Sequence, residues 1–153
     1  MTTPSVLPAG FVGNSSDFAK CKVDRSGALR LQAFSTPVPS LSAIGVIIGL
    51  IPFQAGARVQ IDDKSVYTDN IGGATTTLNL GYVYDDNVSF TNDLDAWSSL
   101  NTAAQAGGFV TVDEKEGLTF VAQGNGWIVA QIAGLATDTL GNIFGQVCVA
   151  YDA

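Results

Sequence analysis

The strongest constraint on the fold is a period-two alternation of apolar and polar residues that recurs in several short segments. In ATTTLNLGY (74–82), one face of an extended chain carries threonine, two leucines and tyrosine, and the other carries threonine and asparagine. ARVQID (57–62) and NIFGQVCVAY (142–151) alternate in a similar way. Successive side chains of a β-strand point to opposite faces, and β-branched threonine suits the exposed face. These segments are therefore predicted to be strands with one buried face.

Glycine, proline and acidic turns separate these segments from others with strand character. In ALRLQAF (28–34), three apolar residues alternate with Arg30 and Gln32: Leu29, Leu31 and Ala33. Residues 95–108 are predicted to form either one short helix capped by Asp95 or a long loop. Further strands are predicted at 43–51, 109–113, 117–123 and 127–134. Several short strands with at most one helix predict an all-β protein, an antiparallel β-sandwich or barrel.

The size and charge of the chain narrow the possible partners. The chain has 153 residues, 46% of them hydrophobic and 14% charged, which suits one folded domain and argues against disorder. Residues 41–153 hold twelve acidic residues against three basic ones. An acidic body disfavours nonspecific binding to nucleic acid or to anionic lipid. We therefore expect neither nucleic acid nor membrane as a partner.

The amino-terminal sequence and the cysteines indicate an intracellular origin. MTTPSVLPAG (1–10) lacks the features of a signal peptide, and the apolar run at 41–53 is shorter than the roughly 18 residues that a membrane span needs. Cys21 and Cys148 have no CxxC partner. We expect a soluble protein that is made in the cytoplasm and keeps both thiols free.

Residues 1–27 are predicted to form an arm, distinct from a β-domain at 28–153. Proline and glycine punctuate the arm, and its apolar residues follow no clean period. Those apolar residues need burial, either against the body of the chain or against another subunit. We assign them, with two cations of the arm and Arg58 of the body, as candidate partner-binding residues: Val6, Leu7, Phe11, Val12, Phe18, Lys20, Lys22 and Arg58.

Residue types that carry chemistry are scarce. The chain contains no histidine, which removes Ser-His-Asp and Cys-His nucleophile systems and the usual zinc sites. Its acidic pairs fall in predicted turns, where aspartate is favoured by local hydrogen bonds. No phosphate-binding glycine motif is present. We therefore expect no enzyme activity, no cofactor and no metal.

Aromatic residues offer an alternative function. Trp97, Trp127, Tyr82, Tyr84 and Phe90 would serve a β-sandwich carbohydrate-binding module if they formed an exposed platform. Burial in the core or in a subunit interface is the ordinary explanation for such residues in alternating strands.

The order of the turn and strand motifs is similar to that of small virion structural proteins of tailed bacteriophages, of the capsid decoration or cement type. The resemblance covers residues 28–151 and is strongest at 50–82, where AGARV is followed by SVYTDNIGGATTTLNLGY; GWIVAQIAG and a last strand ending in tyrosine complete it. The chain departs from that pattern at Phe53 and Gln54, which extend a turn, and in its acidic loop at 85–95.

The resemblance implies a jelly-roll-like fold and a structural role on the virion. The implied function is to bind and stabilise the outer surface of the icosahedral capsid, with the major capsid protein as partner and with self-association into a trimer or dimer. A head–tail or tail subunit is the alternative within the same class. The implied location is the capsid surface, after synthesis in the host cytoplasm.

Overall fold

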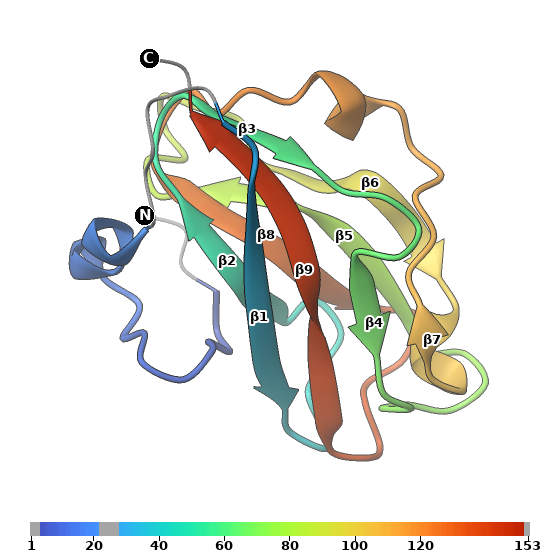
Figure 1. Ribbon diagram of the computed structural model, residues 1–153. Helices are drawn as coiled ribbons and strands as arrows, with labels where there is room; N and C mark the ends of the chain where they lie inside the picture. The colour runs from blue at the N-terminus through green and yellow to red at the C-terminus, as the bar shows by residue number, and fades with distance from the viewer. Residues whose placement is uncertain (1–3, 22–27, 152–153) are drawn as a thin grey trace.

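The structure is a computed structural model that describes residues 4–21 and 28–151. Two antiparallel sheets pack face to face (Figure 1). The first sheet contains β1 (Arg30–Val38), β9 (Gly141–Tyr151), β4 (Val66–Thr68) and β7 (Gly108–Phe109), with β3 (Ala57–Gln60) also paired to β9. The second sheet contains β2 (Ile47–Phe53), β8 (Gly126–Ala133), β5 (Thr77–Tyr84) and β6 (Asp93–Asn101).

The connections confirm the predicted all-β sandwich and give it a jelly-roll order. β3 pairs with residues 148–151 of β9 and β4 with residues 143–145, so the two short strands lie one after the other along one edge of β9. When they are counted as one interrupted strand, eight strands form two four-stranded sheets in the orders 1-9-3/4-7 and 2-8-5-6. Crossing repeatedly between two sheets in this way is the jelly-roll arrangement.

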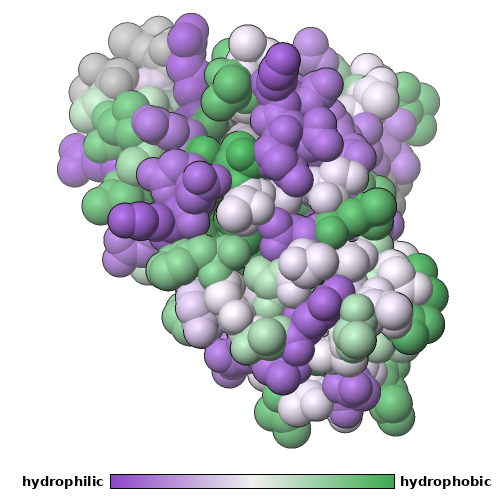
Figure 2. Space-filling model, turned by 90° about the vertical axis from the view of Figure 1, so that its right-hand side faces the viewer, coloured by the Kyte–Doolittle hydropathy of each residue, from purple (hydrophilic) through white to green (hydrophobic). Residues whose placement is uncertain are grey.

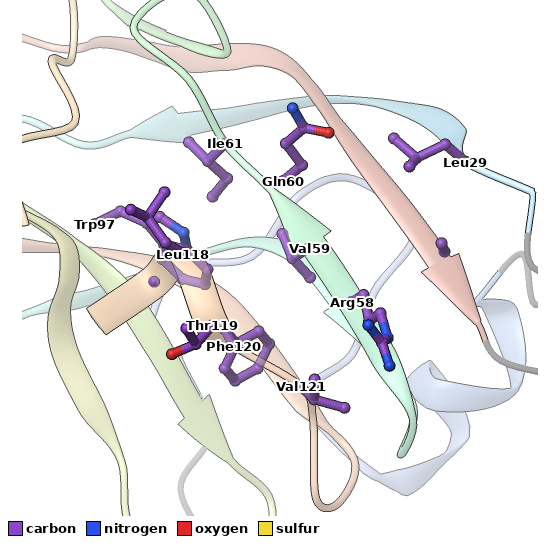
Figure 3. Close-up of a pocket in the computed structure, with 12 residues that line it drawn as sticks. Leu29, Arg58, Val59, Gln60, Ile61, Trp97, Leu118, Thr119, Phe120 and Val121 are labelled. Carbon is purple, nitrogen blue, oxygen red and sulfur yellow. The ribbon is translucent and has the colours of Figure 1, made fainter. Parts of the chain in front are cut away.

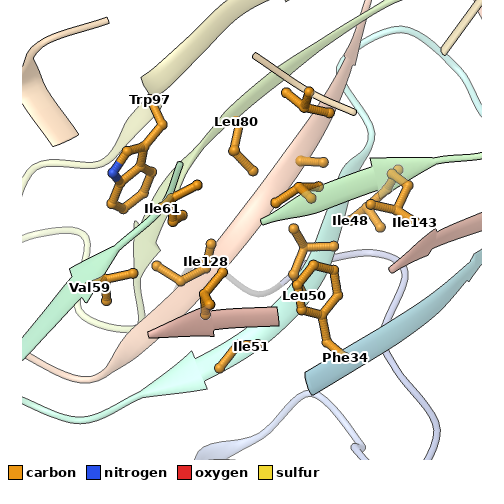
Figure 4. Packing of buried hydrophobic residues seen from close by; sticks show 14 of the residues in the cluster. Phe34, Ile48, Leu50, Ile51, Val59, Ile61, Leu80, Trp97, Ile128 and Ile143 are labelled. Atoms are coloured by element: carbon orange, nitrogen blue, oxygen red, sulfur yellow. The ribbon is translucent and has the colours of Figure 1, made fainter. Parts of the chain in front are cut away.

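The core lies between the sheets, where the inward faces of their strands meet (Figure 4). Its largest fully buried side chains include Trp97, Phe53, Ile48, Ile128 and Ile143. Burying each large apolar side chain contributes about 1.5–3 kcal/mol relative to leaving it exposed. The alternation predicted for β3 is observed, because Ala57 and Val59 are buried while Arg58 and Gln60 are exposed.

The expectation of a helix or a loop at 95–108 is wrong. The first half of this segment belongs to strand β6, and Ala103–Gln105 form a short 3-10 helix, η2. Register shifts between β5 and β6 place Ala96, Trp97 and Ser98 all in buried positions, which hides the strand period. Gly81 allows these shifts, because a Cβ there would lie 2.1 Å from the carbonyl oxygen of Asp93.

Four predicted strands differ from those observed. The segment predicted at 109–113 is strand only at Phe109, in β7, and the segment predicted at 117–123 holds most of the 3-10 helix η3 (Glu116–Thr119) and one isolated bridge residue, Val121.

The strand predicted at 43–51 begins at Ile47, and the preceding loop leaves Leu41 and Ile44 exposed. In β1 the buried residues are Phe34, Thr36 and Val38. The alternating Leu29 and Leu31 therefore lie on the exposed side.

The described part of the arm, residues 4–21, folds back on the chain's own second sheet. Val6 forms a parallel bridge with Ile48 at the edge of β2 (Figure 1). The amide of Ser5 donates to Ile47 O at 2.8 Å, and the amide of Gly49 donates to Val6 O at 2.7 Å. The arm then continues into a 3-10 helix, η1 (Ser15–Lys20).

Within the described residues, no helix is both long enough and apolar enough to cross a membrane.

Candidate partner-binding surfaces

The inner side of the arm covers the outer face of the second sheet. Phe18 is buried with Val83, Trp127 and Val129, and Leu7 and Phe11 pack against the same cluster. The ring of Phe11 meets Trp127 edge-on, with 5.2 Å between ring centroids. In this conformation, Leu7, Phe11 and Phe18, three of the five apolar arm residues predicted to bind a partner, contact the chain's own sheet.

A buried carboxylate holds the arm in shape. Asp17 is fully buried and accepts the amide protons of Val12 and Gly13 at 3.0 and 2.7 Å. Lys20 forms an ion pair with it at 3.3 Å, donates to Gly10 O and lies over the Phe11 ring. Burial acts to raise the pKa of Asp17, but the amide hydrogen bonds and Lys20 outweigh it and lower the pKa.

The remaining predicted binding residues are more accessible. The side chain of Val12 is 65% exposed, and Lys20 is partly exposed beside its ion pair with Asp17. Lys22 lies outside the described residues. Arg58 is exposed on β3, far along the chain from the arm.

Arg58 lines a groove of about 550 Å³ at the edge of the sandwich (Figure 3). One wall is β3, and the other is the segment 117–121, which includes most of the 3-10 helix η3 (Glu116–Thr119). The walls are joined by an Arg58–Val121 bridge and, just beyond it, by a backbone hydrogen bond of 2.8 Å from Ala122 N to Ala57 O. Trp97 and Phe120 line the groove but are buried, whereas Leu118 lines it with a side chain that is 73% exposed.

This groove combines one guanidinium with a lining that is mostly apolar but includes Gln60 and Thr119. Such a combination suits contact with another protein, because the buried centre of an interface is apolar and arginine is enriched in interfaces. Gly117 lets η3 approach the core closely, since a Cβ there would lie 2.2 Å from Cδ1 of Trp97. The groove is therefore fixed by core packing.

Acidic residues from two separate segments come together beside the groove. They are Asp93 and Asp95 at the start of β6, and Asp113, Glu114 and Glu116 in the connection before β8. Burial, followed by the Asp95 side chain, raises the pKa of Asp93. Burial and the neighbouring carboxylates raise the pKa of Glu114. Across residues 4–21 and 28–151, no group of three or more histidine, cysteine or acidic side chains is placed to hold a metal ion.

Other acidic residues make the turn contacts that the sequence predicted. The carboxylate of Asp62 accepts from Lys64 N at 2.8 Å and from the Ser65 hydroxyl at 3.1 Å. Asp86 accepts from the amides of Val88 and Ser89. These carboxylates stabilise loops locally.

The aromatic residues considered as a sugar-binding platform lie mainly inside the protein. Trp97, Trp127 and Tyr84 are at most 3% exposed. Tyr82 packs against Phe120 with ring centroids 4.3 Å apart, and Trp97 contacts the same ring edge-on. These rings therefore contribute to core packing and form no exposed platform.

The two thiols are unpaired and half-buried. Burial, ahead of the charge of Asp17, raises the pKa of Cys21 to about 12. A thiol with such a pKa stays protonated near neutral pH and is a poor nucleophile.

Comparisons with known proteins identify the fold. No family model and no curated protein sequence matches the chain. A chain in the solved structure "Capsid of Ralstonia phage GP4" aligns with a TM-score of 0.65 and 20% identity, over 90% of this chain and 94% of that one. A chain in "Cyanophage Pam1 capsid asymmetric unit" aligns with a TM-score of 0.56 and 19% identity, over 88% and 96% of the two chains. The fold is therefore one that chains of these two phage capsids share.

Proposed function

We propose that this chain is a virion structural protein of a tailed bacteriophage, a decoration or cement protein that binds the outer surface of the icosahedral capsid. The observation that carries the proposal is the nearly end-to-end alignment with one chain in each of two phage capsids. Because the alignments cover almost all of both partners, the matched capsid chains are close in length to this one. A subunit that consists of one sandwich suits an accessory role on a shell built by a separate major capsid protein.

The surface chemistry supports a binding role. The groove at Arg58, which is held in place by core packing, joins a cation to a mostly apolar lining. A specific, stable contact buries roughly 800 Å² on each partner and needs no catalytic group. Repetition of that contact over a shell would raise the overall strength of attachment.

The arm has two possible contributions to capsid binding. Its outward residues, Val12 and Lys20, are available while the arm is docked. Leu7, Phe11 and Phe18 would reach the major capsid protein only if the arm left its own sheet. Comparing capsid binding by the full chain and by a chain without residues 2–20 tests whether the arm contributes at all, and Val12→Ser, which alters only an outward residue, separates the two cases.

Sedimentation with undecorated capsids tests the proposed function. We expect the purified protein to sediment with the shells in a copy number comparable with that of the major capsid protein. Failure to sediment, or saturation at the few copies that one vertex would take, would contradict a decoration role.

Two variants test the groove. Arg58→Ala is expected to weaken capsid binding by about tenfold or more, because a truncated arginine anchor commonly costs an interface at least 1.4 kcal/mol. Lys64→Ala removes an exposed cation outside the groove and should leave the affinity unchanged. Equal effects of both substitutions would indicate a general charge effect and would argue against the groove as the contact.

A further inference from the structure

The lower end of the sandwich carries large exposed aliphatic side chains on two neighbouring loops. Loop 39–46 joins β1 to β2, and loop 134–140 joins β8 to β9 (Figure 1). The exposed side chains are Leu41 at 81%, Ile44 at 58%, Leu135 at 54% and Leu140 at 73%. In the space-filling view, hydrophobic side chains project at this end, with polar side chains between them (Figure 2). Contiguous apolar patches on a soluble protein mark interaction sites more often than chance.

The two loops are held together, so the side chains cannot easily turn inward. The amide of Leu41 donates to Thr137 O at 2.8 Å, and the amide of Thr137 donates to Ser42 O at 3.0 Å. The buried hydroxyl of Thr137 accepts from Ser42 N at 2.8 Å and donates to Pro39 O at 3.0 Å. A surface that is ordered before binding loses less conformational entropy when a partner arrives.

Leu41 has a backbone conformation that glycine would adopt with less strain. Its φ is 63°, in the left-handed region that favours glycine. A leucine here is strained, and its side chain packs little against its own protein. The local fold gains nothing from this leucine that glycine would not supply, which points to a contact outside the monomer.

The charge distribution indicates which partner binds the exposed aliphatic side chains of the lower end. The four loops of the lower end, 39–46, 69–76, 102–107 and 134–140, contain no lysine or arginine, and their acidic residues are Asp69 and Asp138. The carboxylate of Asp69 is occupied locally, accepting from Asn142 N at 2.8 Å. The segments 85–95 and 113–116 instead hold seven acidic residues near the opposite end.

Two copies of a chain with net charge −7 repel each other most where their acidic ends meet. The eight residues of β8 separate the ends by about 26 Å, well beyond the screening length of about 8 Å at physiological salt. A contact between lower ends therefore keeps the seven-acid ends apart while it buries the four aliphatic side chains.

We propose that the lower end is a self-association surface that binds the lower end of a second copy of this chain. Each copy contributes the same patch, as is usual in a closed symmetric assembly of identical subunits. The resemblance implies self-association, and this inference assigns it to one surface of the sandwich; it does not depend on binding to a capsid.

Analytical ultracentrifugation of the full chain tests the proposal with two matched substitutions. Leu140→Ser alters the patch, and Leu118→Ser alters a leucine that is also 73% exposed but lies in the Arg58 groove. We expect the wild type and Leu118→Ser to sediment as assemblies of the 15.9 kDa chain, and Leu140→Ser to dissociate at least tenfold more readily. Raising the salt concentration should not weaken the wild-type association, because the contact is apolar and the acidic ends already lie beyond the screening length.

Leu41→Gly gives a second test that does not depend on how well Leu140→Ser folds. Glycine accepts the left-handed φ, so the melting temperature of the monomer should not fall, while self-association should weaken as in Leu140→Ser. A monomeric wild type, an unchanged mass for both patch variants, or equal dissociation by Leu118→Ser would overturn the proposal. Loss of capsid binding without a change in mass would also overturn it, because the shell would then be the occupant.

Discussion

On the outer face of the second sheet, Trp127 is only 2% exposed because the arm covers it, whereas on the outer face of the first sheet Leu31 remains 68% exposed. Both side chains occupy outward positions of regular strands, and both are large and apolar. They differ in whether another segment of the same chain reaches them. The comparison teaches that strand pattern places a side chain on a face, while an irregular segment elsewhere decides whether that face is a core or a surface.

Removing the arm should have the largest effect on this difference. Deletion of residues 2–20 exposes Trp127 and removes three packed arm side chains, each worth about 1.5–3 kcal/mol if fully buried, partly offset by the entropy that the arm regains. We expect a clearly lower melting temperature, a red-shifted tryptophan emission and an unchanged β-type circular dichroism spectrum. Unchanged stability and emission would show that the arm does not cover the sheet in solution.

A single arm residue should account for much of that effect. Phe18→Ala is expected to destabilise the protein by about 3–5 kcal/mol, the usual cost of truncating a buried phenylalanine. The destabilisation caused by Phe18→Ala cannot exceed that caused by the arm deletion, because an undocked arm contributes nothing more to the free energy of unfolding. Val12→Ala, at a 65% exposed position of the same arm, is the control and should change the free energy of unfolding by less than about 0.5 kcal/mol. Urea denaturation of the wild type, Phe18→Ala and Val12→Ala measures the change in the free energy of unfolding.

The sequence predicts some of this architecture well, for physical reasons. The predicted alternation is observed in β3 and in the first half of β5, because each has one face in the core there. The jelly-roll class follows from a resemblance in turns and strands. The strand β6 escaped prediction because its register shifts bury three successive residues, Ala96 to Ser98.

The binding surfaces were less predictable, because they join distant segments. Alternation alone places Arg58 outward, but the opposite wall of its groove comes from residues 117–121. The apolar residues of the arm indicated that burial was needed, and two possible locations remained open. Only the three-dimensional structure shows Phe11 and Phe18 against Val83, Trp127 and Val129.

Acid should weaken the docking of the arm, because Asp17 holds it in shape only while ionised. The pKa of Asp17 is lowered from its ordinary value of 3.8, so its contribution to stability is complete above about pH 4 to 5 and is lost as the pH falls through the folded-state value. Asp17→Asn should cost about 1–2 kcal/mol at pH 7, because a neutral amide accepts the amide protons less strongly. Below pH 4, the free energy of unfolding of the variant should also depend less on pH than that of the wild type, because Asp17 no longer titrates. A curve that keeps its wild-type shape below pH 4 in the variant would exclude Asp17 as the titrating group.

The smallest effect is expected on the uncovered face. Leu31→Ser should change the free energy of unfolding by less than about 0.5 kcal/mol, because the side chain is 68% exposed and little of it is buried on folding. A melting temperature several degrees lower would show that this face is covered in solution, and the contrast between the two sheets would then disappear.

The position of β9 also has a consequence for biosynthesis. β9 is the common partner of β1, β3 and β4, and Arg30 at the start of β1 is paired with Val149 near the end of β9. A ribosome therefore releases the other strands of the first sheet long before the strand that joins them exists. Sequence-distant pairing of this kind slows folding and leaves strand edges open to other nascent chains. A premature stop before residue 141 would thus remove more than one strand, because the remaining strands of the first sheet would lose the partner that assembles them.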